Sequence, residues 1–123
     1  MQDVLFRVTR VVNLNRESYD VYIGRAGCGH DGYFGNPIRV GFPCQICMKT
    51  HQRGGDTLSC YEWYLEERLS SDQEFQERVC LLSGRTIGCF CKPGPCHGDI
   101  LAQHADKLAN VETLEDTLSL FRL

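Results

Sequence analysis

The sequence lacks any long apolar segment. No run approaches the roughly 18 residues that a membrane-spanning helix requires. The first stretch, MQDVLFRVTRVV, carries polar residues throughout, whereas a signal peptide has an uninterrupted apolar centre. We therefore expect a protein that does not enter a membrane, and we expect to find it in the cytoplasm.

A strong charge of either sign is also missing. The 13 Lys and Arg residues stand against 16 Asp and Glu residues, which gives a formal net charge of −3 at pH 7. A mildly acidic chain is not attracted to phosphate backbones or to anionic lipid headgroups. We therefore expect neither broad nucleic-acid binding nor membrane association. A local basic pocket and a protein partner are both compatible with this charge.

The pattern of apolar residues changes between strand-like and helix-like spacing along the chain. Segments rich in Val, Ile and Tyr predict strands over residues 8–15, 19–25 and 85–91. Apolar residues at helical spacing predict helices over residues 57–71, with Asp56 as N-cap, and over 72–82, 96–110 and 113–123. The 123 residues are thus expected to form one small α/β domain over residues 1–123, a Rossmann-like sheet flanked by helices.

Glycine is concentrated in one segment. Residues 26–56, counted together with Gly24, hold eight of the 12 glycines and two of the four prolines. Irregular segments of this length are uncommon inside compact domains unless something organises them. We expect residues 26–56 to be a metal-binding loop insertion, because zinc can supply the ordering free energy that a loop with little apolar surface lacks.

Cysteines and histidines in and near this loop have the spacing of a zinc site. The chain has eight cysteines, and without an export signal clustered cysteines indicate metal binding or chemistry more than disulfides. Cys44 and Cys47 have the C-x2-C spacing with which two thiolates grip one zinc ion. A thioredoxin-like redox pair fits less well, because that motif follows a strand and opens a helix. The preferred zinc ligands are Cys44, Cys47, His51 and Cys60, with Cys28 and His30 as alternates.

The stretch GCFCKPGPCHGD, residues 88–99, gathers three more cysteines and a histidine. Residues two apart in a strand face the same side, so Cys89 and Cys91 are expected to share a face. Cys96 would stand at the start of a helix, where the helix N-terminus and a nearby Lys92 or His97 favour its thiolate. Backbone N–H groups at that helix start, approached closely past Gly98, could hold a phosphate or carboxylate.

Three interpretations of this stretch stay open. Cys96 and His97 line an active or binding site, supported by Cys91. Alternatively, Cys89, Cys91, Cys96 and His97 bind a second metal ion. In the third interpretation the cysteines are small buried residues in a tight junction between a strand and a helix.

The segments VVNLN, YDVYIGR, GNP, TLSCYEWYL and GRTIGCFCKPGPCHGDIL together resemble an uncharacterised family of phages and bacteria, domain of unknown function 4326. The resemblance spans about residues 8–108, and the insertion CQICMKTH looks like a subset of that family. It implies an α/β domain with a small-molecule site and no particular reaction. The matching positions are Tyr22, Gly24, Arg25, Gly35, Asn36 and Pro37 in a first loop, and Cys89, Cys91, Cys96, His97 and Asp99 in a second.

Two hypotheses about function follow. In the first, the protein acts on or senses a small anionic, nucleotide-like or nucleobase-like molecule. Arg25 would bind its anionic part, and Asn36 would contact a base or ribose edge. Cys96 would be the reactive group, and His97 or Asp99 would exchange a proton with it. In the second, it is a non-catalytic, zinc-stabilised module that engages a host protein or a nucleic acid.

Overall fold

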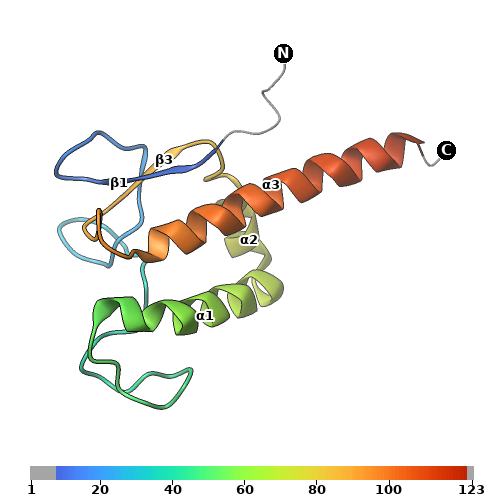
Figure 1. The fold of residues 1–123 in the computed structure, drawn as a ribbon. Coiled ribbons are helices and arrows are strands. Elements are labelled where there is room, and N and C mark those ends of the chain that lie inside the picture. Colours follow the sequence, from blue (N-terminus) through green and yellow to red (C-terminus); the bar gives the residue numbers. More distant parts are fainter. Residues whose placement is uncertain (1–7, 122–123) are drawn as a thin grey trace.

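A parallel sheet and three α-helices form the fold of residues 8–121, the part of the chain that the computed structural model describes (Figure 1). The strands are β1 (Arg10–Asn13), β2 (Val21–Tyr22) and β3 (Thr86–Cys89). Strand β3 lies in the middle and pairs in parallel with both others, in the order β1-β3-β2. The expected α/β class is therefore confirmed, whereas the Rossmann-like arrangement stays a prediction.

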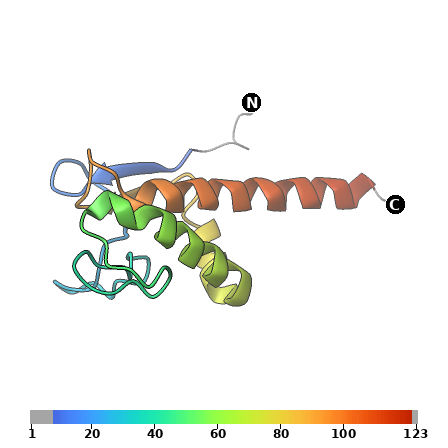
Figure 2. The same cartoon turned by 60° about the horizontal axis from the view of Figure 1, so that its bottom comes forward.

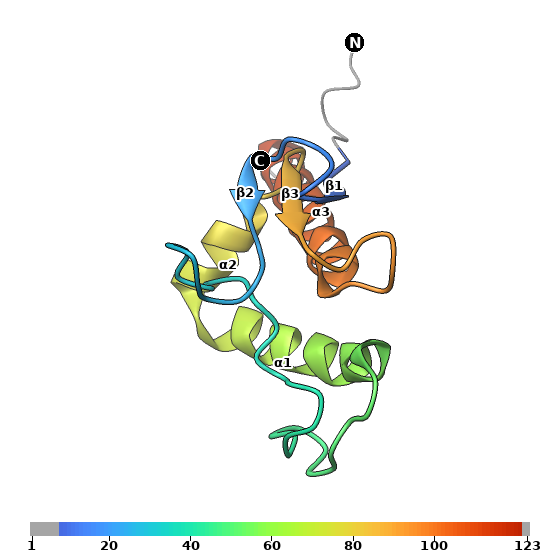
Figure 3. The same cartoon turned by 90° about the vertical axis from the view of Figure 1, so that its left-hand side faces the viewer.

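Each predicted strand is present but shorter than expected. The first two strands of the chain are not neighbours, because β3 lies between them (Figure 3). Ile87, Gly88 and Cys89 of β3 are all buried. A strand with no solvated face is best placed at the centre of a parallel sheet, where both of its edges form hydrogen bonds.

The helices are α1 (Leu58–Ser71), α2 (Gln73–Cys80) and α3 (His97–Phe121), and a single turn of 3-10 helix, η2 (Gly54–Thr57), precedes α1. Helix α3 packs against β1 and β3, and α1 and α2 pack against α3 (Figures 1 and 2). The far half of α3 extends beyond the other elements (Figure 2). None of the helices in residues 8–121 is long and apolar enough to cross a membrane.

Two predicted helix boundaries were wrong. Asp56 does not cap α1, because it lies inside η2, where Thr57 Oγ1 donates a hydrogen bond to the Gly54 carbonyl. The two helices expected over residues 96–110 and 113–123 are one helix up to Phe121. No Gly or Pro stands between the two predicted segments, so nothing in the backbone ends the helix there.

The core brings the start of α3 against the sheet. Ile23, Ile87 and Leu101 are fully buried together with Tyr61, Leu65 and Phe75 from α1 and α2. A Cβ atom at Gly98 would come within 2.7 Å of Ile23 and 2.8 Å of Val11. Only glycine therefore allows the first turn of α3 to approach the sheet this closely. The consequence is that Cys96 and His97 lie beside the carboxyl ends of the strands.

Candidate functional site

Four side chains from the glycine-rich loop and helix α1 converge. The sulfur atoms of Cys44, Cys47 and Cys60 and a ring nitrogen of His51 all lie within 4.8 Å of one another. In a tetrahedral thiolate site with metal–sulfur bonds of about 2.3 Å, neighbouring ligand atoms stand about 3.8 Å apart. The donor set and its spacing therefore fit a metal ion. It is the preferred set of the sequence analysis.

The local sequence builds this cluster from a tight turn. The Cys44 N–H donates to the Lys49 carbonyl (2.8 Å), and the Met48 N–H donates to the Cys44 carbonyl (2.9 Å). Met48 has a φ of 67°, the left-handed conformation that lets the chain reverse here. The Ile46 N–H approaches the Cys44 sulfur at 3.4 Å, and His51 Nε2 lies 3.5 Å from the Cys47 sulfur. The turn thus presents its sulfur atoms on one side.

The cluster favours thiolate on one member. Burial raises the pKa of Cys44, but the backbone N–H groups of Cys47 and Ile46, with the side chains of His51 and Cys60, lower it to about 6. Burial and the two neighbouring cysteines raise the pKa of Cys60 to about 11. The three sulfurs would repel one another if all were thiolates, and a bound cation would remove this repulsion, as expected for metal ligands.

The two alternate metal ligands lie elsewhere. Cys28 is exposed, and the ring of His30 stacks on Tyr22 with centroids 3.8 Å apart and planes at 20°. Both residues line the cavity described next. They belong to a different surface from that of Cys44 and its partners.

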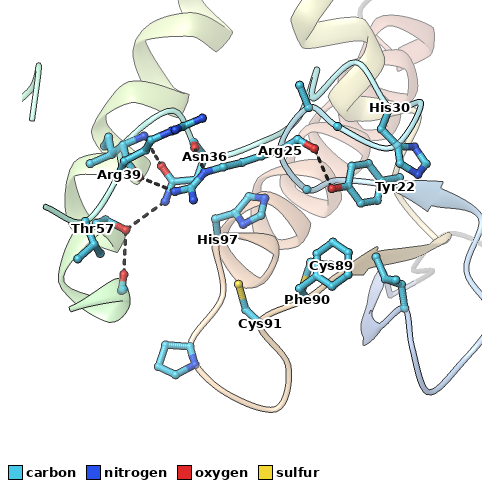
Figure 4. Close-up of a pocket in the computed structure, with 18 of the residues that line it drawn as sticks. Tyr22, Arg25, His30, Asn36, Arg39, Thr57, Cys89, Phe90, Cys91 and His97 are labelled. Atoms are coloured by element: carbon cyan, nitrogen blue, oxygen red, sulfur yellow. Dashed lines mark hydrogen bonds between the residues drawn. The ribbon is translucent and has the colours of Figure 1, made fainter. Parts of the chain in front are cut away.

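A cavity of about 870 Å³ opens between the two loops that follow β2 and β3 (Figure 4). Its walls include the aromatic side chains of Tyr22, Phe42 and Phe90 and the guanidinium groups of Arg25 and Arg39. In Figure 4, His97 lies between the arginine-bearing loop and the loop of Cys89, Phe90 and Cys91. The cavity therefore lies at the carboxyl ends of parallel strands, where α/β proteins bind ligands.

Arg25 and Asn36 chiefly hold the first loop in shape. Arg25 donates from Nε to the Asn36 carbonyl (3.1 Å) and from Nη2 to the Ile38 carbonyl (2.8 Å). The Asn36 amide accepts from the Ile38 N–H (2.9 Å) and donates to Thr57 Oγ1 (3.1 Å). Arg25 keeps further N–H donors for a ligand. The amide of Asn36 is already engaged on both its oxygen and its nitrogen.

Close packing requires glycine at two positions of the first loop, Gly24 and Gly35. A Cβ atom at Gly24 would collide with the hydroxyl of Tyr22, and one at Gly35 would lie 2.8 Å from the Gly24 carbonyl oxygen. The Tyr22 hydroxyl donates to the Arg25 carbonyl at 2.8 Å. Gly24 thus lets the Tyr22 ring lie along the cavity wall, whereas Gly35 lines a smaller neighbouring pocket.

Cys89, Cys91 and Cys96 form a second cluster, with sulfur atoms within 4.8 Å of one another. Cys89 and Cys96 are buried with their sulfurs 2.8 Å apart, and Cys91 is exposed. The Cys96 thiol and the N–H groups of Cys91 and Lys92 outweigh burial and lower the pKa of Cys89 to about 6. The pKa of Cys96 is raised by its hydrogen bond with Cys89 and by burial. The lowered pKa expected for Cys96 is found on Cys89 instead.

His97 is buried at the start of α3. Its Nε2 lies 2.7 Å from the Ile23 carbonyl oxygen and so carries the proton of the neutral ring. Its Nδ1 lies 3.9 Å from the Cys96 sulfur. Burial lowers the pKa of His97. The ring is therefore neutral at pH 7, with an N–H that ties α3 to the end of β2.

The other residues expected at this loop serve its structure. Lys92 Nζ forms an ion pair with Asp99 at 2.7 Å, so this carboxylate faces the lysine. Gly98 packs on the sheet, and its N–H donates to the Cys96 sulfur at 3.2 Å. The proton-transfer role expected for Asp99 and the ligand-binding roles of Lys92 and Gly98 stay predictions.

Sequence reasoning missed the apolar wall of the cavity. Phe42 and Phe90 are 58% and 60% exposed although both are large and apolar. Phe90 directly follows buried Cys89, so the alternation of a strand was a signal that its ring faces away from the core. Arg39 was not singled out either, because a lone arginine in a loop carries no pattern.

Comparisons with known proteins identify the family of the chain. A family model described as Domain of unknown function (DUF4326) matches residues 7–107. The chain is also similar to an uncharacterized 12.4 kDa protein in the nrdA-td intergenic region of Enterobacteria phage T4, with 29% identity over 105 residues, which cover 83% of this chain and 82% of the phage protein. No solved structure matches the chain significantly. The match over residues 7–107 spans both loops of the cavity, and the chain belongs to the DUF4326 family.

Proposed function

We propose that the protein is a zinc-stabilised α/β domain that binds a small anionic molecule carrying a planar ring, such as a nucleotide, in the cavity between the loops after β2 and β3. The observation that carries this proposal is that aromatic and arginine side chains line the same cavity. They are Tyr22, Phe42 and Phe90 on the aromatic side, and Arg25 and Arg39. Aromatic faces stack on bases, and guanidinium groups pair with phosphate.

The size of the cavity supports a ligand of this class. Small-molecule sites typically enclose about 300–1,000 Å³, and this cavity encloses about 870 Å³. Most of its wall is apolar, with a few convergent polar groups, among them the buried His97. A flat hydrophobic ring with one charged end matches such a wall better than a sugar or a free inorganic anion does.

Zinc is the metal that best fits the first cluster. Three thiols and one imidazole converge at Cys44, Cys47, Cys60 and His51, and closed sets of this type hold structural zinc. The loop they close has little apolar surface, so the ion would order the wall that carries Arg39 and Phe42. Zinc in this position supplies structure to the cavity and takes no part in chemistry.

Calorimetric titration of the purified protein tests the binding proposal. The probes are the 5′-monophosphates of adenosine, guanosine, cytidine and uridine, with ribose 5-phosphate and inorganic phosphate as controls for the anion alone. We expect at least one nucleotide to bind more tightly than both controls, and Phe90→Ala and Arg39→Ala each to weaken it about tenfold. Equal affinity for nucleotide and inorganic phosphate would overturn the proposal.

One observation favours the second candidate function, a module that engages another protein. Met48 is 80% exposed at the tip of the Cys44–Cys47 turn, close in sequence to exposed Phe42. Exposed large apolar side chains on a rigid turn are typical of contact surfaces. This function predicts that Met48→Asp removes binding to a defined host protein while nucleotide affinity is unchanged. Retained partner binding in that variant would exclude it.

A further inference from the structure

The second cysteine cluster has the features of a ligand set. Cys89 ends β3, Cys91 follows in the loop, and Cys96 precedes the first turn of α3. Although they come from a strand, a loop and a helix start, their three sulfur atoms lie within 4.8 Å of one another. Three thiols brought together from three elements are a donor set suited to a soft or borderline divalent ion.

Backbone N–H groups already point at these sulfurs. The Gly98 N–H donates to the Cys96 sulfur at 3.2 Å, and the N–H groups of Cys91 and Lys92 face the Cys89 sulfur. Such N–H···S contacts orient thiolate ligands and offset their negative charge. Arg25 adds positive charge near Cys91. The surroundings therefore favour an anionic metal–thiolate group.

We propose that Cys89, Cys91 and Cys96 form a second metal centre, for Zn²⁺ or an ion of the same class, with a fourth coordination position open to the cavity. On binding, each of the three cysteines that still carries a thiol proton releases it to solvent, and the three thiolates bind one divalent ion. The centre is separate from the Cys44 cluster and differs from it in kind: the first is closed by four protein ligands, whereas the second has three.

The open position follows from where the three cysteines lie relative to the cavity. Cys89 and Cys91 line the cavity, whereas Cys96 lies behind them against the start of α3. An ion held by all three would therefore border the cavity on the side of Cys89 and Cys91. Zinc sites with three protein ligands keep the fourth position for water or a bound molecule. This part rests on the proposed function, since the occupant would be the anionic molecule in the cavity.

The distance between Cys89 and Cys96 requires a small rearrangement. Their sulfurs stand 2.8 Å apart, about 1 Å less than the edge of a tetrahedral thiolate site. An ion bound between the two residues would separate their sulfurs by this amount. The competing outcome is a disulfide between the same two residues.

Metal content per chain, measured without any nucleotide, tests the second centre. Reduced, chelator-stripped protein is loaded with Zn²⁺ or with Co²⁺, dialysed, and analysed for metal atoms and for the thiolate-to-Co²⁺ absorption bands. We expect two ions per chain in the wild type, one in Cys89→Ser and Cys96→Ser, and two in the control Cys28→Ser, whose thiol is exposed outside both clusters. Nucleotide binding is scored separately, so failure of one proposal leaves the other measurable.

Cys91→Ser tests the same centre in a variant that is expected to fold, because Cys91 is exposed and its replacement leaves the core intact. We expect this variant to bind the second ion at least about tenfold more weakly and to keep the first. One ion per chain in the wild type, unchanged in all three variants, would overturn the proposal. So would a Cys89–Cys96 disulfide in protein purified without oxidant, shown by peptide mass spectrometry.

Discussion

Nη2 of Arg25 lies 2.8 Å from the carbonyl oxygen of Ile38. This hydrogen bond, with the one to the Asn36 carbonyl, ties the loop after β2 to the segment that leads into the Cys44 turn. The sequence suggested that Arg25 grips an anion. The structure adds a second task, since the same guanidinium sets the position of the loop that closes the cavity.

Arg25→Lys is expected to destabilise the protein by about 1 kcal/mol, because an ammonium group cannot span both carbonyls as the planar guanidinium does. Arg39→Lys is the matched control, since the Arg39 side chain forms no hydrogen bond or ion pair within residues 8–121, where only its backbone carbonyl accepts one, from the Phe42 N–H. Urea unfolding measures both variants. Equal stability of the two would show that the Arg25 contacts do not hold the loop.

Cys60→Ser is expected to abolish binding of the structural ion and to lower the melting temperature by at least about 10 °C, because the ordering free energy of the loop comes from that ion. Cys28→Ser is the control, since Cys28 lies outside the cluster. Elemental analysis and thermal unfolding with and without a strong chelator check this. A wild-type melting temperature that the chelator leaves unchanged would contradict a structural role for the metal.

Gly24→Ala is expected to fold but to bind nucleotide at least about tenfold more weakly. The new Cβ atom would displace the Tyr22 hydroxyl, which is the far end of a side chain, so the ring turns away from the cavity wall while the backbone stays in place. Gly54→Ala is the control: Gly54 also lines the cavity, and a Cβ atom there meets nothing within 4 Å. Circular dichroism checks the fold, and calorimetry measures the affinity. Wild-type affinity in Gly24→Ala would show that the Tyr22 ring is not used.

The stability of the protein is expected to fall above pH 10 because of Tyr61. Burial raises the pKa of this phenol far above its ordinary value of 10.0. The folded protein therefore keeps the phenol protonated, while the unfolded chain loses the proton above pH 10, which favours unfolding as the pH rises. At pH 11 this costs about 1.4 kcal/mol.

Tyr61→Phe is the control for that pH dependence, because phenylalanine fills the same site without a titrating group. Urea unfolding at pH 9 and pH 11 measures both proteins. We expect the wild type to lose about 1.4 kcal/mol more than the variant between these values. Parallel losses in the two proteins would mean that Tyr61 is deprotonated within the folded state.

The metal cluster was the part of the site most accessible to sequence reasoning. The C-x2-C spacing fixes two ligands on one tight turn, and His51 and Cys60 lie within reach of it. Cys28 and His30 are as close in sequence but line the cavity instead. Their glycine-rich surroundings carry no pattern of spacing, so the sequence could not separate them from the ligands.

The chemistry of the second loop was less accessible. The position of Cys96 at a helix start predicted a lowered pKa for its thiol. The sequence did not show that the buried sulfur of Cys89 lies beside it and takes the negative charge instead. Likewise, the sequence did not indicate that the carbonyls of Asn36 and Ile38 occupy two of the N–H groups of Arg25. Contacts between residues distant in sequence decide both cases, and no local pattern encodes them.

The most direct test of the account is a two-dimensional NMR titration of the ¹⁵N-labelled, zinc-loaded protein with the nucleoside 5′-monophosphates. We predict saturable shifts of backbone amides in both loops that border the cavity, at Tyr22, Arg25, Phe90 and Cys91, with amides of α2 unaffected. Absence of shifts at millimolar nucleotide, or shifts confined to other surfaces, would contradict the claim that the cavity between the β2 and β3 loops is the binding site.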